Sequence, residues 1–237
     1  MNFLSKKIIV LLFLFLPLVA SAQSFPSTPI LYDANTDENP VTTSIWTNGL
    51  TGTGQCGASS GVFVGTSGTD DCYITQSYGE DQEVFITYPN LGSLQADTNI
   101  ILYFCVQSSG IGSANLDGYG VRIRKITAGN DVVKLVRITN TGTTDLGTGW
   151  SAGEFSNGWK IGARRETGGT FTLYMDTGSG WTQQDQVTSE TVYTCANTFI
   201  GYRGQSSNSH GDDFGGGNVG SAASNQNLIM LTPMMFN

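Results

Sequence analysis

The chain has little of what metal, redox and nucleic-acid-binding sites are built from. Its only histidine is His210, and no Cys-x-x-Cys occurs, so neither a zinc ribbon nor a thioredoxin-type site is supported. No lysine or arginine occurs from Gln23 to Val121, where there are ten acidic residues. The formal net charge of −8 disfavours nucleic acid and anionic membrane surfaces as partners.

Long apolar runs are absent except at the N-terminus. Two lysines precede the apolar run from Ile8 to Val19, and Ala20-Ser21-Ala22 fits the rule for signal-peptide cleavage. The alternative, a membrane anchor, needs roughly 20 apolar residues, whereas this run is shorter and is interrupted by Pro17. We therefore expect residues 1–22 to be a signal peptide. The protein would be secreted to an extracellular, periplasmic or cell-surface location, with no membrane span after cleavage.

The four cysteines are an even number in a chain that we expect to be exported, which favours disulfides. Three pairings are possible. Cys56 with Cys72 would close a loop rich in glycine and serine, and Cys105 with Cys195 would join two strand-like runs far apart in sequence. We expect these two disulfides, Cys56 with Cys72 and Cys105 with Cys195, to form together.

Helical periodicity is also lacking, because no stretch of the mature chain keeps a 3.6-residue apolar period for three turns. The segment Thr167-Gly168-Gly169-Thr170 predicts a tight hairpin, since glycine accepts the positive φ of such turns. Short β-rich runs separated by Gly, Asn, Asp and Ser recur along the whole chain. They are Gly61–Val64, Cys72–Gln76, Glu83–Tyr88, Ile100–Val106, Gly120–Ile126, Val132–Thr139, Trp159–Arg165, Thr170–Asp176, Thr191–Cys195, Thr198–Tyr202 and Leu228–Phe236. This pattern predicts an all-β, two-sheet antiparallel sandwich, with residues 23–237 forming a single domain.

Several of these runs carry phrases in a recognisable order. The phrases are Asp117-Gly118-Tyr119-Gly120-Val121-Arg122, Lys134-Leu135-Val136-Arg137-Ile138, Gly158-Trp159-Lys160-Ile161-Gly162-Ala163-Arg164, Phe171-Thr172-Leu173-Tyr174-Met175-Asp176, Phe199-Ile200-Gly201-Tyr202 and Asp212-Asp213-Phe214. Together they resemble the concanavalin A-like lectin/glucanase jelly rolls of the laminin-G type, which implies a jelly-roll sandwich. The chain departs from that pattern at Asp176-Thr177-Gly178, where the family usually has Asp-Gly. Residues 215–237 extend past the pattern as a C-terminal tail with an apolar end.

Catalytic groups do not follow the patterns of enzymes with this fold. In Glu80-Asp81-Gln82-Glu83 the two glutamates would face opposite sides, so they cannot converge on one sugar bond. Lyases of the fold need a histidine, and His210 stands in a Ser/Asn/Gly segment typical of a solvated loop. We expect no catalytic residues, with a glycoside hydrolase or polysaccharide lyase kept as an alternative.

A calcium site is a further hypothesis. Asp33, Asn35 and Asp37 offer oxygen ligands at alternate positions of one loop. The resemblance implies that Asp213, or its neighbour Asp212, could complete a structural calcium site there. The alternative is a turn whose side chains bond to their own backbone.

A ligand-binding face follows from strand alternation. Apolar residues would face the core and leave Arg122, Arg164, Tyr174 and Tyr202 outward as one basic and aromatic surface, if their strands share a sheet. Aromatic rings stack on sugars, and guanidinium groups bind carboxylate or sulfate. This favours a noncatalytic lectin or adhesion module for a polysaccharide or glycoconjugate, with an anionic polysaccharide as the predicted ligand. The alternative is that these side chains only cover the wet face of the sheet.

A structural role is the second class of function. Eight of the nine basic residues that follow the signal peptide lie between Arg122 and Arg165, so charge is segregated along the chain. The apolar run from Leu228 to Phe236 could add a strand to a neighbouring copy. A subunit of an extracellular filament or fibre, a surface layer or a viral appendage, self-assembling through this C-terminal tail, is the alternative function.

Overall fold

The computed structural model describes residues 24–32, 46–48, 56–59, 62–65, 70–88, 99–107, 116–126, 129–139, 142–204 and 210–220. These residues contain strands and no helix. The strands are β1 (Ile30–Tyr32), β2 (Trp46–Asn48), β3 (Cys56–Ser59), β4 (Val62–Gly65), β5 (Asp70–Ile74), β6 (Gln82–Thr87), β7 (Asn99–Val106), β8 (Gly118–Arg124), β9 (Val132–Thr139), β10 (Gly142–Trp150), β11 (Lys160–Glu166), β12 (Thr170–Asp176), β13 (Trp181–Val187), β14 (Phe199–Gly204) and β15 (His210–Asn218).

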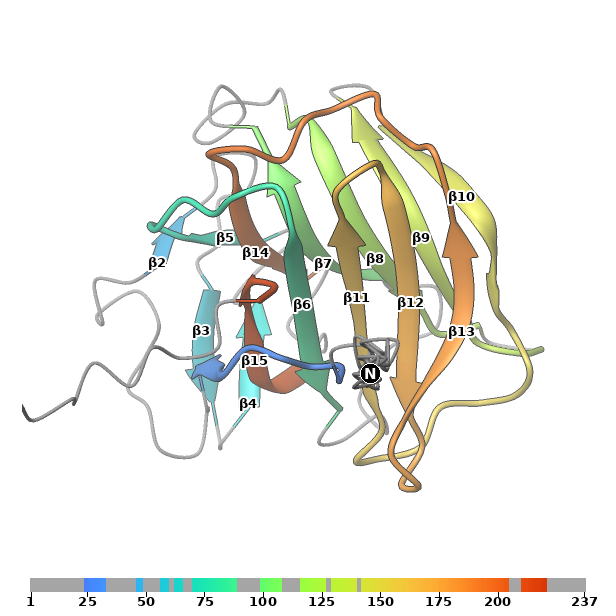
Figure 1. The fold of residues 1–237 in the computed structure, drawn as a ribbon. Coiled ribbons are helices and arrows are strands. Elements are labelled where there is room, and N and C mark those ends of the chain that lie inside the picture. The colour runs from blue at the N-terminus through green and yellow to red at the C-terminus, as the bar shows by residue number, and fades with distance from the viewer. Residues whose placement is uncertain are drawn as a thin grey trace, which may run out of the picture.

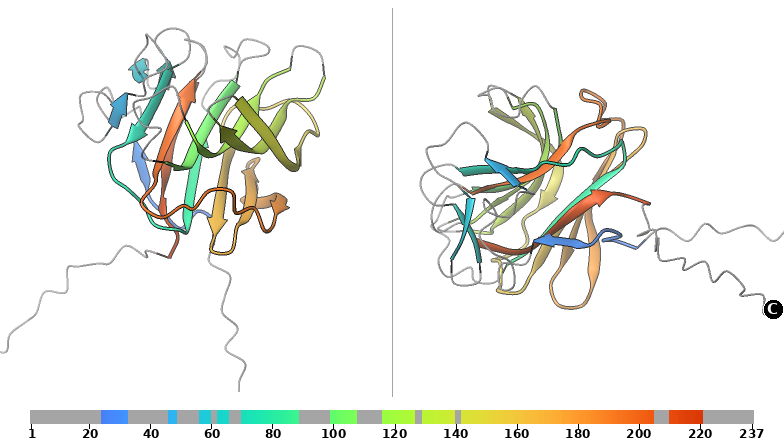
Figure 2. Two further views of the ribbon diagram at one scale, coloured as in Figure 1. Left: turned by 90° about the horizontal axis from the view of Figure 1, so that it is seen from above. Right: turned by 90° about the vertical axis from the view of Figure 1, so that its left-hand side faces the viewer.

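The strands form two antiparallel sheets that lie face to face (Figures 1 and 2). Sheet A has the order β13-β12-β11-β6-β15-β4-β3, with β1 paired to β15, and sheet B has the order β10-β9-β8-β7-β14-β5-β2. Strands distant in sequence are neighbours in both sheets, as where β6 pairs with β11 and β15. The predicted all-β jelly-roll sandwich is confirmed.

The core lies between the inner faces of the two sheets. Alternation along β12 places Phe171, Leu173 and Met175 in it, and alternation along β8 places Val121 and Ile123 opposite them. Each such side chain stabilises the fold by about 1.5–3 kcal/mol relative to leaving it in water. The outer faces are therefore the places where ligand contacts can occur.

An N-terminal arm, residues 24–29 leading into β1, crosses the outer face of sheet A. Figure 1 shows this blue segment running in front of β15 and β6 toward β11. Only Ile30 and Tyr32 pair with a strand, on β15. The arm explains why β6 and β11 are buried on both faces although they belong to a two-layer sandwich.

Most strand predictions agree with the structure, and the hairpin between β11 and β12 is present with Gly168 and Gly169 at φ of 90° and 78°. Three predictions on secondary structure are wrong. Thr191–Cys195 forms no strand. His210, expected in a loop, begins β15, and β15 continues to Asn218, so residues 215–218 belong to the sheet and not to the tail. Strands β10 and β13 were missed because their exposed, polar residues lack an apolar alternation.

Several predictions fall on residues outside the described ranges. They include the signal peptide, the run from Leu228 to Phe236 and the calcium-loop residues Asp33, Asn35 and Asp37, which stay predictions. Within the described ranges, no helix is both long enough and apolar enough to cross a membrane.

Candidate functional site

The outer face of sheet A is organised in rows of directly opposed residues. One row runs Asp212, Thr87, Lys160, Asp176 and Trp181 across β15, β6, β11, β12 and β13. The next row on the same face carries Phe85, Gly162 and Tyr174, and the third carries Glu83, Arg164 and Thr172. Because opposed residues of antiparallel strands share a face, each row is a continuous line of side chains.

Glu83 and Arg164 in the third row fasten the arm to the sheet. The Glu83 side chain is completely buried and that of Arg164 is 3% exposed, and their ion pair has an N–O distance of 2.7 Å. Glu83 Oε1 also accepts bonds from the backbone N–H groups and the hydroxyls of Ser27 and Thr28. Arg164 donates in addition to the carbonyl of Ser24 at 2.9 Å. The side chains of this ion pair thus hold the arm on the sheet by hydrogen bonds, in place of the backbone hydrogen bonds that would join a strand to its neighbour.

Phe25 anchors the arm in the second row. Its ring stacks on Tyr174 with centroids 4.2 Å apart and packs against Trp181 in a T-shaped arrangement with centroids 4.8 Å apart. Gly162 makes room for it, since a Cβ atom there would come within 2.7 Å of Phe25 and 2.5 Å of the Val84 carbonyl oxygen. Aromatic pairs of this kind contribute about 0.5–1.5 kcal/mol beyond their buried area, so the arm helps to fix the position of Trp181.

A pocket of about 180 Å³ lies where the arm meets the first row. Its walls combine apolar and polar groups from the arm and from five strands of sheet A, namely β1, β6, β11, β13 and β15. The lining residues are Pro26, Thr28, Ile30, Phe85, Thr87, Lys160, Trp181 and Asp213. Ile30 stands at 51% exposure, which makes this rim one of the few places where a large apolar side chain faces solvent among the described residues.

Asp213 reaches the pocket because β15 is irregular. The register with β6 shifts between Asp212 and Gly215, and Asp213 has a φ of 51°. A positive φ is costly for a residue with a side chain, and such bulges often redirect a side chain beside a binding site. The sequence held no signal for this bulge beyond the run of glycines that follows it.

Three hydrogen-bond donors of the pocket are unused. The Lys160 ammonium, the Trp181 indole N–H and the Thr87 hydroxyl have no hydrogen-bond partner in the described part of the chain. Asp213, an acidic residue, lines the same pocket. An aromatic ring beside unused donors and a carboxylate is the combination that binds a polyhydroxylated ring.

The predicted four-residue surface does not exist as one surface. Arg164 and Tyr174 lie on the outer face of sheet A, as predicted, but the arm covers Arg164 completely and Tyr174 in part. Arg122 lies on the other sheet. Tyr202 faces the core with 0% exposure, so its outward orientation was wrong. Ile200 two residues earlier shares its face, and that alternation could have revealed it.

Arg122 occupies a charged group on the outer face of sheet B. It donates to Asp145 at 2.6 Å, and Lys134 pairs with the other oxygen of the same carboxylate at 3.0 Å. Both cations are therefore already neutralised in part. The role of Arg122 in ligand binding stays a prediction, and Arg122 cannot share a surface with Arg164 and Tyr174, which lie on sheet A.

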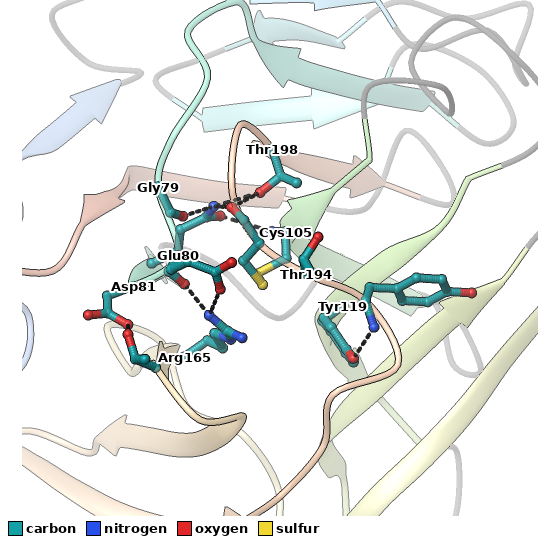
Figure 3. A network of polar contacts seen from close by, with 12 residues as sticks. Gly79, Glu80, Asp81, Cys105, Tyr119, Arg165, Thr194 and Thr198 are labelled. Atoms are coloured by element: carbon teal, nitrogen blue, oxygen red, sulfur yellow. Dashed lines mark hydrogen bonds and ion pairs between the residues drawn. A yellow bond between two sulfur atoms is a disulfide. The ribbon is translucent and has the colours of Figure 1, made fainter.

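The disulfide between Cys105 and Cys195 is present, as predicted. The side-chain amide of Gln82 bonds to the backbone of both cysteines: it accepts from the Cys105 N–H at 2.9 Å and donates to the Cys195 carbonyl at 2.9 Å. Figure 3 shows this network beside the contact of Glu80 with Arg165. Cys72 is also disulfide-bonded; the side chain of its expected partner, Cys56, lies outside the described ones. The network ties β6, β7 and the segment before β14 together.

The carboxylates considered for catalysis are separated. Glu83 on the outer face of sheet A is held by Arg164, whereas Glu80 precedes the strand and pairs with Arg165. These two groups do not converge on a common cavity.

The calcium hypothesis is tested only in part. Asp33, Asn35 and Asp37 lie outside the described ranges, and Asp213 lines the pocket. The described residues contain no group of three or more His, Cys, Asp or Glu side chains that could hold a metal ion. Asp212 Oδ1 accepts the Asp213 N–H at 2.8 Å, so one of its oxygens is already in use. Calcium stays a prediction.

Comparison with known structures identifies the fold. The chain superposes on the Emp47p carbohydrate recognition domain with a TM-score of 0.55 and 16% identity, over 81% of this chain and 94% of that one. The chain has the concanavalin A-like jelly-roll fold. The exoplasmic/lumenal domain of VIP36 in its form with Ca²⁺ and Man3GlcNAc matches with a TM-score of 0.55 and 12% identity, over 77% and 87% of the chains. The potassium-bound Emp46p carbohydrate recognition domain also matches with a TM-score of 0.55, at 13% identity and over 83% and 100%. No protein-family model and no curated protein sequence matches the chain.

Proposed function

We propose that this protein is a secreted, noncatalytic carbohydrate-binding module whose glycan site is the pocket on the outer face of sheet A. The observation that carries the proposal is the convergence of Trp181 with the unused donors of Lys160 and Thr87 and with the carboxylate of Asp213. A sugar ring offers an apolar face to the indole, and its hydroxyls both donate and accept hydrogen bonds.

The fold supports this proposal. The matched domains of Emp47p and Emp46p are carbohydrate recognition domains, and the VIP36 domain has been solved with Man3GlcNAc. At identities of 12–16% the likeness concerns the fold alone. The location of the site therefore rests on the side chains of this chain, and it lies on a face that the sequence patterns did not single out as a pocket.

Secretion has separate support. The fully buried disulfide between Cys105 and Cys195 is of the kind that persists in an oxidising compartment. Together with the predicted signal peptide, it favours an extracellular, periplasmic or cell-surface location.

The experiment is a glycan array followed by calorimetry on the mature protein and its Trp181→Ala variant. We expect saturable binding by the native chain and a loss of at least about tenfold in affinity for the variant, because central aromatic anchors dominate such sites. Asp145→Asn, on the other sheet, is the control and should bind normally. Absence of glycan binding by the native protein, or full binding by Trp181→Ala, would contradict the proposal.

Self-assembly into a filament is a separate proposal, which rests on the charge segregation and on the apolar run from Leu228 to Phe236. Sedimentation as a function of concentration tests it. Larger species that disappear when residues 228–237 are deleted would support a structural subunit, and a monomer at all concentrations would exclude it.

A further inference from the structure

We propose that the pocket receives the terminal uronic acid of an acidic polysaccharide, with Lys160 binding the sugar carboxylate. This inference rests on the proposed glycan-binding function and adds the chemical class of the ligand and the residue that selects it. The sequence favoured binding of an anionic polysaccharide by Arg122 and Arg164, whereas this proposal assigns the binding of the anionic group to Lys160.

The size of the pocket favours a chain end. Its volume of about 180 Å³ is below the roughly 300–1,000 Å³ of pockets that enclose drug-sized molecules. One sugar ring fits such a space, and the arm residues Pro26 and Thr28 form one of its walls. A terminal ring enters without threading a chain past this wall.

Lys160 is distinguished from the other cations near the arm and on the opposite sheet. Arg164 is paired with Glu83, and Arg122 and Lys134 are paired with Asp145. The ammonium of Lys160 has no such partner in the described part of the chain, although its residue is half-buried in the pocket wall. A cation partly removed from water is stabilised by an anionic ligand more than by a neutral hydroxyl.

Two acidic residues in the row of Lys160, Asp176 and Asp212, each use one carboxylate oxygen to accept backbone hydrogen bonds. Asp176, directly opposite on β12, uses Oδ1 to accept the backbone N–H groups of Gly178 and Gly180 at 2.8 and 2.9 Å. Asp212 Oδ1 accepts the N–H of Asp213. The pocket also has unused donors at Lys160, Trp181 and Thr87, which a ligand rich in acceptors matches.

Asp213 and Trp181 make the site one for a sugar and not for any small anion. The indole offers a flat apolar surface, and the Asp213 carboxylate can accept from ring hydroxyls. A uronic acid combines the three features, since it has an apolar ring face, hydroxyl donors and a carboxylate at C6.

The test compares sugars that differ only at C6. Methyl β-glucuronide with methyl β-glucoside, and methyl α-galacturonide with methyl α-galactoside, are titrated at millimolar concentration into the mature protein by calorimetry. We expect the uronide to bind at least about tenfold more tightly than the neutral glycoside in one pair or both. Lys160→Met should abolish that preference, and Lys160→Arg should retain part of it. Lys134→Met removes the same charge from the other sheet and should leave the preference unchanged.

Two further arms complete the test. Acetate alone should not bind, since it lacks the ring, and an oligosaccharide whose terminal uronic acid is capped by a neutral sugar should bind more weakly than the uncapped one. Binding of glycans through Trp181 without a uronide preference, or with a preference that survives in Lys160→Met, would overturn this inference and leave the proposed function standing. Absence of any glycan binding would overturn both.

Discussion

Removing the charge of Glu83 is the sharpest perturbation of the site. In Glu83→Gln the shape is kept, but the buried guanidinium of Arg164 loses its counter-ion and the arm loses acceptor capacity for Ser27 and Thr28. Removing one partner of a buried ion pair costs about 3–5 kcal/mol. If the arm also leaves the sheet, Phe25 returns to water, which contributes about 1.5–3 kcal/mol of the same loss.

Urea unfolding followed by tryptophan fluorescence measures the effect. We expect Glu83→Gln to lower the free energy of unfolding by about 3–5 kcal/mol, whereas Asp145→Asn, in an exposed ion pair, should lower it by less than about 1 kcal/mol. Hydrogen exchange of the Ser27 and Thr28 amides should accelerate in the first variant and not in the second. Equal losses in the two variants, or an arm that stays protected in Glu83→Gln, would refute the view that this ion pair holds the arm.

The ion pair also predicts non-additivity. Once Glu83 is replaced, Arg164→Met removes an unpaired buried charge, so the double variant should be more stable than the sum of the two single losses implies. Ligand affinity should fall in both single variants, because the arm forms one wall of the pocket.

Two further predictions concern stability. Replacing Cys105 and Cys195 by alanine should lower the free energy of unfolding by about 4–5 kcal/mol, since the disulfide closes a loop with a sequence separation of 90, and urea unfolding of the variant measures the loss. Burial raises the pKa of Tyr78 and of Tyr119 to about 12 from the ordinary 10.0. Between pH 10 and pH 12 the folded state therefore keeps these protons while the unfolded chain releases them. The free energy of unfolding keeps its full value below about pH 10 and falls as the pH rises from about 10 to about 12. Ultraviolet titration of tyrosinate alongside thermal melts tests this, and complete tyrosine ionisation by pH 11 in the folded protein would contradict it.

The arm explains which site predictions failed. Alternation along β11 predicts Arg164 on the outer face, which is right, but only the position of Ser24 and Phe25 over that face shows that it is covered. Alternation within one strand also cannot tell which sheet the strand joins, so Arg122 was grouped with residues of the other sheet. For Tyr202 the pattern was available in the sequence, since Ile200 two residues earlier shares its buried face.

Trp181 and Lys160 illustrate what pattern analysis leaves out. In the sequence, Trp181 follows Gly180, and Lys160 stands between Trp159 and Ile161. Nothing in their spacing relates them, since they lie on β11 and β13 with β12 between. The row that contains both exists only because the register of β11 on β12 and of β12 on β13 aligns them.

The sequence by itself determined the all-β class, the sandwich and the hairpin at Gly168 and Gly169, whereas it left three cysteine pairings open. The three features follow from local backbone preference and from the two-residue period of side chains. Tertiary structure alone decided where the arm lies, which polar groups pair with one another, and which donors, at Lys160 and Trp181, stay available for a ligand. Those outcomes depend on sheet order and register, which bring distant residues together, and a one-dimensional pattern carries no record of them.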